Sequence, residues 1–231
     1  MTAEIIEDPK LRDRFGVFQD RGDAGLYLAR FLERYRGEDA VVLAIPSGGI
    51  PIGLAISKHL NLPLDLLIIR KIPIPTNPEA GFGAISLEGD VVLNQPLVRM
   101  LGLSEEDIEE LSKTVRRDLE ERNRLFRENR PWPDLQGKIV VLVDDGLASG
   151  YTMMAAIRMV RRRNPSRIVV GVPTASWNTV RLLSEEVDLI VCPNIRTGFS
   201  FAVADAYMNW YDLSREEVIE LLREHNLLPH E

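Results

Sequence analysis

The residues best suited to chemistry lie together in one short stretch, residues 144–152, with the sequence DDGLASGYT. Gly146 and Gly150 would let the backbone turn tightly and approach a ligand closely. Ser149 and Thr152 would add hydroxyl donors, and a helix starting there would aim unpaired N–H groups at an anion such as a phosphate. Two carboxylates beside such a site are expected to face sugar hydroxyls or a magnesium ion.

The elements around this stretch favour a ligand site at the edge of a sheet. Residues 138–143 (KIVVLV) form a short, branched apolar run that is typical of a buried strand, and a helix is expected over residues 152–163. Open α/β sheets bind ligands at the carboxyl ends of their strands. The sequence has no G-x-x-x-x-G-K-[ST] motif, and Gly81-Phe82-Gly83 lacks the third glycine of a dinucleotide fingerprint.

Strand-like and helix-like segments alternate along the chain, which predicts a doubly wound α/β fold with a mostly parallel sheet. We expect a single domain over residues 1–231, with an inserted hairpin and long helix between about residues 85 and 136. The strands ending at Ile45 and Val143 should be neighbours at the topological switch point. The proline- and glycine-rich residues 72–84 are expected to form a loop. Further helices are expected at residues 23–35, 50–60, 104–127, 177–184 and 214–224, and further strands at residues 41–45, 65–70, 167–172 and 187–192.

The bulk composition narrows the class of protein. Hydrophobic residues make up 45% of the chain, which suits a globular protein with one good core. The formal net charge of −7 gives no general attraction for nucleic acid. The single cysteine, Cys192, excludes an internal disulfide framework and fits a reducing compartment. Residues 1–10 do not resemble a signal peptide and no apolar run is long enough to span a bilayer, so we expect a cytoplasmic protein without membrane contact.

The stretch VLVDDGLASGYT (residues 141–152) resembles the signature of type I phosphoribosyltransferases, which binds 5-phosphoribosyl-1-pyrophosphate (PRPP). The resemblance extends to an uncharacterised group of such proteins from bacteria and archaea. It is carried by short motifs in the same order along most of the chain: FQDR (18–21), PSGG (46–49), RK (70–71), NPE (77–79), VLN (92–94), the acidic loop, WY (210–211) and SREEV (214–218).

The resemblance implies a role for each part of the site. Asp144 and Asp145 would be the catalytic pair that holds the ribose hydroxyls, directly or through Mg²⁺. The 5-phosphate would be bound by Gly146, Leu147, Ala148, Ser149, Gly150, Tyr151 and Thr152. Pyrophosphate would be bound by Ser47, Gly48, Gly49, Arg70 and Lys71. The turn after the first strand often contains an unusual cis peptide, for which the Ser47–Gly48 bond is the candidate. Related sequences more often carry arginine where Ser47 stands, and residues 72–84 resemble the flexible hood that closes over PRPP.

The function implied is transfer of the 5-phosphoribosyl group from PRPP to a nitrogen acceptor, a nucleobase, with release of pyrophosphate, in a protein that we expect to be a homodimer. One alternative is a non-catalytic PRPP sensor that uses the arginine-rich helix after Ser104 to bind RNA. A solvated amphipathic helix explains those arginines better, so a nucleic-acid partner is not favoured. The other alternative is a hydrolytic or phosphorolytic enzyme for a different ribose phosphate.

Overall fold

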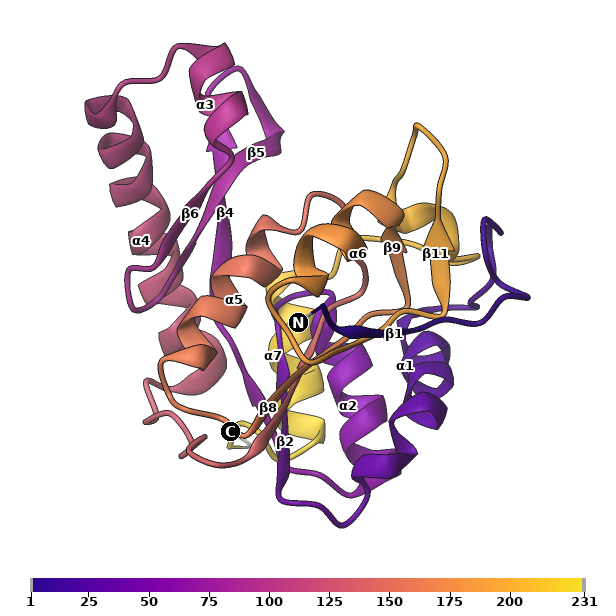
Figure 1. Ribbon diagram of the computed structural model, residues 1–231. Coiled ribbons are helices and arrows are strands. Elements are labelled where there is room, and N and C mark those ends of the chain that lie inside the picture. The colour runs from indigo at the N-terminus through magenta and orange to yellow at the C-terminus, as the bar shows by residue number, and fades with distance from the viewer. Residues whose placement is uncertain (1, 230–231) are drawn as a thin grey trace.

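The apolar runs of the chain assemble into one six-stranded parallel sheet in the order β1-β10-β8-β7-β2-β3 (Figure 1). The computed structural model describes residues 2–229. The sheet confirms the predicted doubly wound α/β class. Its strands are β1 (Glu4–Ile6), β2 (Ala40–Ala44), β3 (Leu64–Leu66), β7 (Ile139–Val143), β8 (Arg167–Gly171) and β10 (Leu189–Val191).

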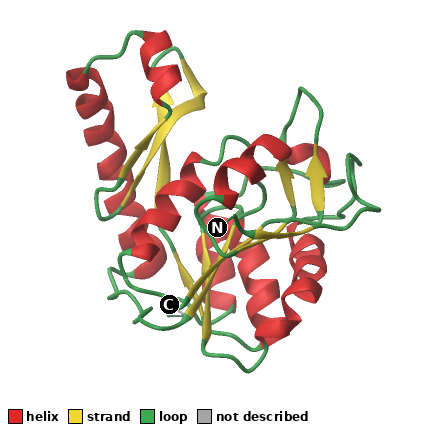
Figure 2. Cartoon of the chain, viewed as in Figure 1, coloured by secondary structure: helices red, strands yellow, loops and turns green. Residues whose placement is uncertain are grey.

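Both faces of this sheet are buried, because alternate residues of each strand point to opposite sides. In β2, Val42 and Ala44 join one apolar cluster while Val41 and Leu43 join the other. Helices therefore cover both faces, as Figure 2 shows. The first cluster includes α1 (Arg21–Ala29), α2 (Gly49–Leu60) and α7 (Arg215–Glu224), and the second includes α5 (Tyr151–Arg161) and α6 (Trp177–Ser184).

Strands β2 and β7 pair in parallel over their full lengths, from Ala40↔Ile139 to Ala44↔Val143. The chain continues from β2 outward to β3 on one side and from β7 outward to β8 on the other. This confirms the predicted switch point between the two strands. The loops that follow β2 and β7 therefore lie beside one another at the carboxyl edge of the sheet.

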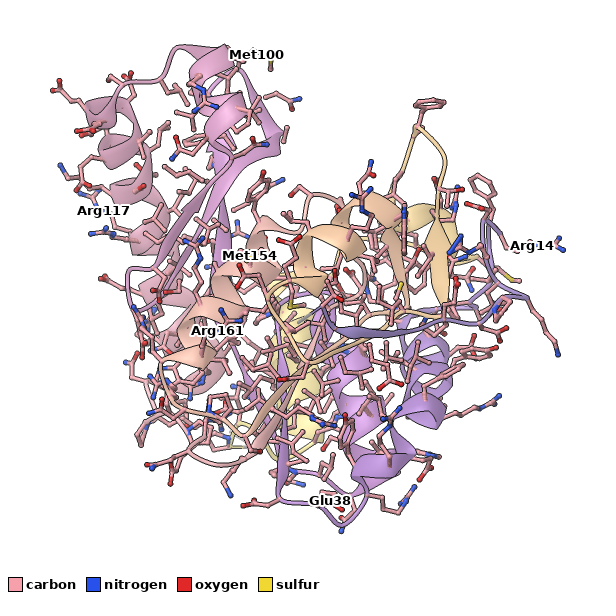
Figure 3. All side chains as sticks on the ribbon, viewed as in Figure 1. Arg14, Glu38, Met100, Arg117, Met154 and Arg161 are labelled. Atoms are coloured by element: carbon pink, nitrogen blue, oxygen red, sulfur yellow. The ribbon has the colours of Figure 1, made fainter. Side chains whose placement is uncertain are left out.

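Residues 69–127 form an arm that projects from the core in Figure 1. It combines a three-stranded antiparallel sheet with two helices, and Met100, labelled at its tip in Figure 3, is 76% exposed. A capping box between Ser104 and Asp107 starts the long helix. The elements of the arm are β4 (Ile69–Ile74), β5 (Asn77–Ser86), β6 (Val91–Leu93), α3 (Gln95–Leu101) and α4 (Glu105–Arg127).

The prediction of a loop at residues 72–84 is wrong, because β4 and β5 pair along most of this segment. Pro73 lies at a register irregularity, where a missing N–H costs the ladder least. Gly83 marks a close approach rather than a turn: a Cβ there would lie 2.5 Å from the Val92 carbonyl oxygen. The inserted antiparallel structure therefore begins at Ile69, well before the expected residue 85, and the strand expected at residues 65–70 is divided between β3 and β4.

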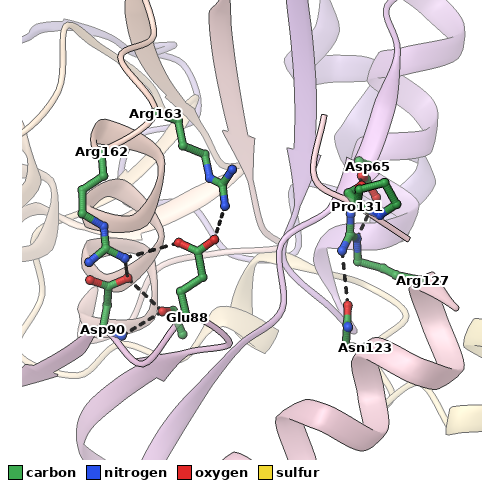
Figure 4. Close-up of polar contacts among 9 residues, drawn as sticks. Asp65, Glu88, Asp90, Asn123, Arg127, Pro131, Arg162 and Arg163 are labelled. Atoms are coloured by element: carbon green, nitrogen blue, oxygen red, sulfur yellow. Dashed lines mark hydrogen bonds and ion pairs between the residues drawn. The ribbon is translucent and has the colours of Figure 1, made fainter. Parts of the chain in front are cut away.

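Ion pairs attach the base of the arm to the core on two sides (Figure 4). Arg127 donates to both carboxylate oxygens of Asp65, at 3.0 and 2.8 Å, and is 1% exposed. On the other side, Arg162 and Arg163 at the end of α5 pair with Glu88 in the β5–β6 turn. The arm is thus tied to the same helix that begins at the DDGLASGYT loop.

Several short elements complete the chain. The helix expected over residues 23–35 is divided into α1 and a 3₁₀ helix, η1 (Arg30–Tyr35). Strands β9 (Thr174–Ser176) and β11 (Asn194–Arg196) form a small parallel sheet, and η2 (Val203–Ala206) follows. In the described part of the chain, no helix is both long enough and apolar enough to cross a bilayer.

Candidate functional site

The loop at residues 144–152 joins β7 to α5, as predicted, and its backbone is fixed by neighbouring elements. Gly150 caps the helix with a φ of 79°, a conformation that favours glycine, and a Cβ there would lie 2.6 Å from the Thr179 methyl carbon. The Leu147 N–H donates to the Thr174 carbonyl at 3.0 Å. The loop is therefore held against β9 and leads directly into the amino end of α5.

A pocket of about 510 Å³ lies over this loop. Every residue of the predicted acidic pair and phosphate loop lines it. The same pocket is lined by Lys71 from β4, by Ala80, Gly81 and Gly83 from β5, by Met153, and by Val203 from η2. The arm and the core thus contribute to one site.

The two acidic residues are held close together and are poorly solvated. The Asp145 N–H donates to Asp144 Oδ1 at 2.8 Å. Burial and the charge of Asp145 raise the pKa of Asp144 well above its ordinary value. Burial also raises the pKa of Asp145, although the charge and hydrogen bond of Arg21 oppose that shift. A hydroxyl donor or a cation entering the pocket would stabilise the ionised pair.

Arg21 and Tyr207 contact the acidic pair, and Trp210 and Tyr211 contact Arg21. None of the four was predicted as a site residue. Arg21 Nε donates to Asp145 Oδ2 at 2.9 Å, and Nη1 donates to the Tyr211 carbonyl at 2.9 Å. The guanidinium lies 4.0 Å from the centre of the Trp210 ring. The Tyr207 hydroxyl donates to the Asp145 carbonyl at 2.6 Å, and burial raises the pKa of Tyr207 so that this proton is retained. The only signals in the sequence were the FQDR and WY motifs.

The predicted pyrophosphate turn after β2 touches the acidic loop. A Cβ on Gly48 would lie 1.9 Å from Asp145 Oδ2, so only glycine fits without displacing that carboxylate. The cis peptide is Pro46–Ser47, and the prediction of Ser47–Gly48 is wrong. Gly48 already has right-handed helical backbone angles and caps α2.

Arg70 and Lys71 face different sides of β4, because consecutive residues of a strand point to opposite faces. Lys71 lines the pocket. Arg70 faces α4, where its Nε lies 2.8 Å from Asp118 Oδ2. The prediction placed both cations at the end of a strand, whereas β4 continues to Ile74. The arrangement thus brings Lys71, but not Arg70, to the acidic loop.

The chemistry of the donors suits a hard cation that shares its coordination with a substrate. Asp144 and Asp145 offer two adjacent carboxylates, and Mg²⁺ is commonly held by one or two carboxylates together with substrate phosphates and water. Over residues 2–229, no group of three or more histidine, cysteine, aspartate or glutamate side chains could hold a metal.

Comparison with known proteins identifies the family of this chain. Residues 24–176 match the family described as "Phosphoribosyl transferase domain". The chain is 37% identical over 206 residues to "Putative phosphoribosyl transferase Rv0571c" of Mycobacterium tuberculosis strain H37Rv, and equally to MT0597 of strain CDC 1551. These matches cover 89% of this chain and 46% of each relative, so the chain spans about half the length of these relatives.

Solved structures agree on the fold. TT1426 from Thermus thermophilus has 33% identity and a TM-score of 0.72, with 90% of this chain and 98% of that chain covered. AQ2163 from Aquifex aeolicus has 15% identity and a TM-score of 0.50, with 81% of this chain and 78% of that chain covered. At this identity the likeness concerns the fold alone. On the strength of the matched residues 24–176 and these relatives, the chain belongs to the phosphoribosyl transferase domain family.

Proposed function

We propose that this domain binds PRPP in the pocket over residues 144–152 and transfers its 5-phosphoribosyl group to a nitrogen acceptor, a nucleobase, with release of pyrophosphate. The observation that carries the proposal is the convergence of three parts on one pocket of about 510 Å³: the acidic pair, the loop at the amino end of α5, and Lys71. The turn at Gly48 lies directly against the acidic pair. Each part matches one charged or polar group of PRPP.

The 5-phosphate is assigned to the loop from Gly146 to Thr152. Its last two residues, Tyr151 and Thr152, begin α5, where unpaired N–H groups and the positive end of the helix dipole favour an anion. Ser149 and Thr152 supply hydroxyl donors. This part of the site would fix one end of the sugar and leave its C1 carbon directed toward the rest of the pocket.

The ribose hydroxyls are assigned to Asp144 and Asp145. Cleavage of the bond at C1 develops positive charge on the sugar, which nearby ionised carboxylates stabilise without forming a covalent bond. A Mg²⁺ ion bound with the substrate would neutralise charge on the pyrophosphate. The residues of this chain that would hold it are Asp144 and Asp145, either directly or through water.

Pyrophosphate is assigned to the turn Ser47–Gly49 and to Lys71. Gly48 brings backbone close to the acidic pair, and Lys71 enters from the arm with a positive charge. Ser47 contributes no charge, so Lys71 is the cation of the predicted pyrophosphate set that the structure brings to the pocket. Arg70 is left out of the proposal, because it pairs with Asp118 on the other face of β4.

The arginines of α4 give little support to RNA binding. Arg122 and Arg70 share the Asp118 carboxylate, and Arg127 is buried against Asp65. Arg117 points away from the core in Figure 3 as part of a mixed-charge surface. These contacts favour the amphipathic-helix interpretation over a nucleic-acid surface. A homodimer and a cytoplasmic location stay predictions, and light scattering would test the first.

Calorimetric titration with PRPP, with and without Mg²⁺, tests the proposal. We expect saturable, Mg²⁺-dependent binding, followed by pyrophosphate release when the correct base is supplied. The double substitution Asp144→Asn with Asp145→Asn should abolish turnover and retain the circular dichroism spectrum of the parent protein. Undiminished turnover in that variant would contradict the site assignment. Binding without turnover on any base would favour a PRPP sensor, and release of free phosphoribose without acceptor would favour a hydrolase.

A further inference from the structure

We propose that Arg21 is a positioning residue for this reaction: it fixes the Asp145 carboxylate in one orientation against the pyrophosphate turn, and the segment around Tyr207 and Trp210 fixes Arg21 in its turn. The inference rests on the proposed function. Arg21, Tyr207 and Trp210 lie outside the matched family domain, which runs from residue 24 to residue 176.

The first step of the argument is the burial and orientation of Arg21. The residue is only 8% exposed and begins α1, and its side chain reaches across the sheet edge to the acidic loop. Nε donates to Asp145 Oδ2, the oxygen that packs against Gly48. A buried charge requires a partner, and here the partner is one of the two proposed catalytic carboxylates. Arg21 therefore selects one position for Asp145.

The second step is what holds Arg21. Its Nη1 donates to the Tyr211 carbonyl at 2.9 Å, and its guanidinium stacks 4.0 Å from the centre of the Trp210 ring. The planar guanidinium can donate in two directions while it stacks on a ring, which a lysine ammonium cannot reproduce. The position of the guanidinium is therefore fixed by groups that do not line the pocket.

The third step is the attachment of these groups to the core. Residues 16–19 and 205–209, here called the terminal segments, are joined by backbone hydrogen bonds. Phe18 N–H donates to the Ala206 carbonyl at 3.0 Å, and Met208 N–H donates to the Phe18 carbonyl at 2.8 Å. Tyr207 also donates its hydroxyl to the Asp145 carbonyl at 2.6 Å. Side chain and backbone of Asp145 are thus both held from the terminal segments and the residues that adjoin them.

A carboxylate that is already oriented does not lose conformational freedom when the ribose binds. The entropic cost of binding is therefore smaller, and PRPP binds more tightly. Arg21 itself does not line the pocket. It would act on PRPP only through Asp145, and this dependence separates a positioning residue from one that touches the substrate.

The test is a double-mutant cycle read by calorimetric titration with PRPP and Mg²⁺. The four proteins are the parent, Arg21→Gln, Asp145→Asn and the double variant. We expect Arg21→Gln to weaken PRPP binding by about tenfold, and the double variant to bind no more weakly than Asp145→Asn alone. Arg30→Gln is the matched control, because Arg30 also stacks on an aromatic ring, 5.3 Å from that of Tyr27, but is exposed at the far end of α1. Its affinity should stay within about twofold of the parent.

Each outcome has one meaning. Unchanged affinity in Arg21→Gln, or losses that add in the double variant, would overturn the role of Arg21. Absence of PRPP binding by the parent protein would instead contradict the proposed function. Thermal unfolding of each variant identifies a loss of folding, and if Arg21→Gln does not fold, Arg21→Lys takes its place in the cycle under the same criterion. Lysine keeps the positive charge but cannot donate to Asp145 and Tyr211 while it stacks on Trp210. The loss of PRPP affinity caused by Arg21→Lys should therefore also disappear when Asp145 is replaced by Asn.

Discussion

Two glycine-containing segments line the same pocket, the loop at residues 144–152 and the strand β5, and they use glycine for different purposes. Gly150 has a positive φ and ends the loop at the helix, so it makes a turn. Gly83 has no such conformation and lies within a regular strand, where the Val92 carbonyl comes too close for a side chain. Both glycines therefore lie where another residue comes too close for a side chain, but only Gly150, in the loop, also makes a turn.

The two segments also present their side chains differently. In the loop, consecutive residues all line the pocket, so a contiguous motif describes the site. In the hairpin of β4 and β5, alternate residues face alternate sides, so Lys71 reaches the pocket while its neighbour Arg70 pairs with Asp118. A motif of adjacent residues is informative in a loop and misleading in a strand.

The largest effect is expected where the arm joins the core. Arg127→Met removes one partner of a buried ion pair and leaves Asp65 with Arg130 alone, 3.1 Å away. We expect the free energy of unfolding to fall by about 3–5 kcal/mol, measured by urea denaturation. A single transition would show that arm and core unfold together. Two transitions would show that the hairpin side of the pocket is stable independently of the loop.

The same ion pair predicts a dependence on pH. Burial alone would raise the pKa of Asp65, but Arg127 holds it below the ordinary value. The folded-state pKa is thus lower than the unfolded one, so the stabilisation is complete above the unfolded pKa of about 3.9 and is lost as the pH falls below it. Urea denaturation of the parent protein between pH 6 and about pH 3 should show the free energy of unfolding falling as the pH is lowered. The same decrease in pH should change the free energy of unfolding of Arg127→Met by less.

The second largest effect is expected at the turn Ser47–Gly49, which touches the loop at residues 144–152. Gly48→Ala would place a Cβ 1.9 Å from Asp145 Oδ2 and displace the carboxylate. We expect PRPP binding, measured by calorimetry, to weaken on the order of a hundredfold. Gly171→Ala is the control, because a Cβ there meets only ordinary contacts of 3.5 Å or more. Equal affinity in Gly48→Ala and the parent would mean that the orientation of Asp145 does not matter to the ligand.

The third effect compares neighbours in the hairpin. Lys71→Gln should weaken PRPP binding by about tenfold, because a charge-assisted contact to a phosphate oxygen is lost. Arg70→Gln should change the affinity by no more than about twofold, since Arg70 faces α4. Titrations of both variants at two salt concentrations would check the assignment. Equal losses would restore the original prediction that the two cations act together.

The smallest effect is expected at the β5–β6 turn. Glu88 pairs with Arg162 and Arg163 at the partly exposed end of α5. Glu88→Gln should lower the free energy of unfolding by less than about 1 kcal/mol, and added salt should reduce the difference. A larger loss would mean that this contact, rather than the Asp65 pair, holds the arm in place.

Contiguous features were predictable from the sequence, and distant contacts were not. The β7–loop–α5 unit and the pairing of β2 with β7 follow from local apolar runs and the switch-point rule. Helix α3 was missed although Asn94 caps it and a proline stands in its first turn, a usable signal. Strands β1, β9 and β11 have three residues each, too few for a periodic pattern. Arg21 was missed as a site residue because its partner lies 124 residues away.

That separation has a consequence for how the protein is made. Arg21 contacts Asp145 and Tyr211, which lie 124 and 190 residues further along the chain. Forming these contacts therefore closes large chain loops, which costs conformational entropy. On the ribosome, β7 and its acidic loop emerge before residues 207–211 have been synthesised. Most residues that line the pocket, from Lys71 to Met153, are therefore synthesised early, whereas the Asp145 carboxylate acquires a fixed position only when these later residues have docked.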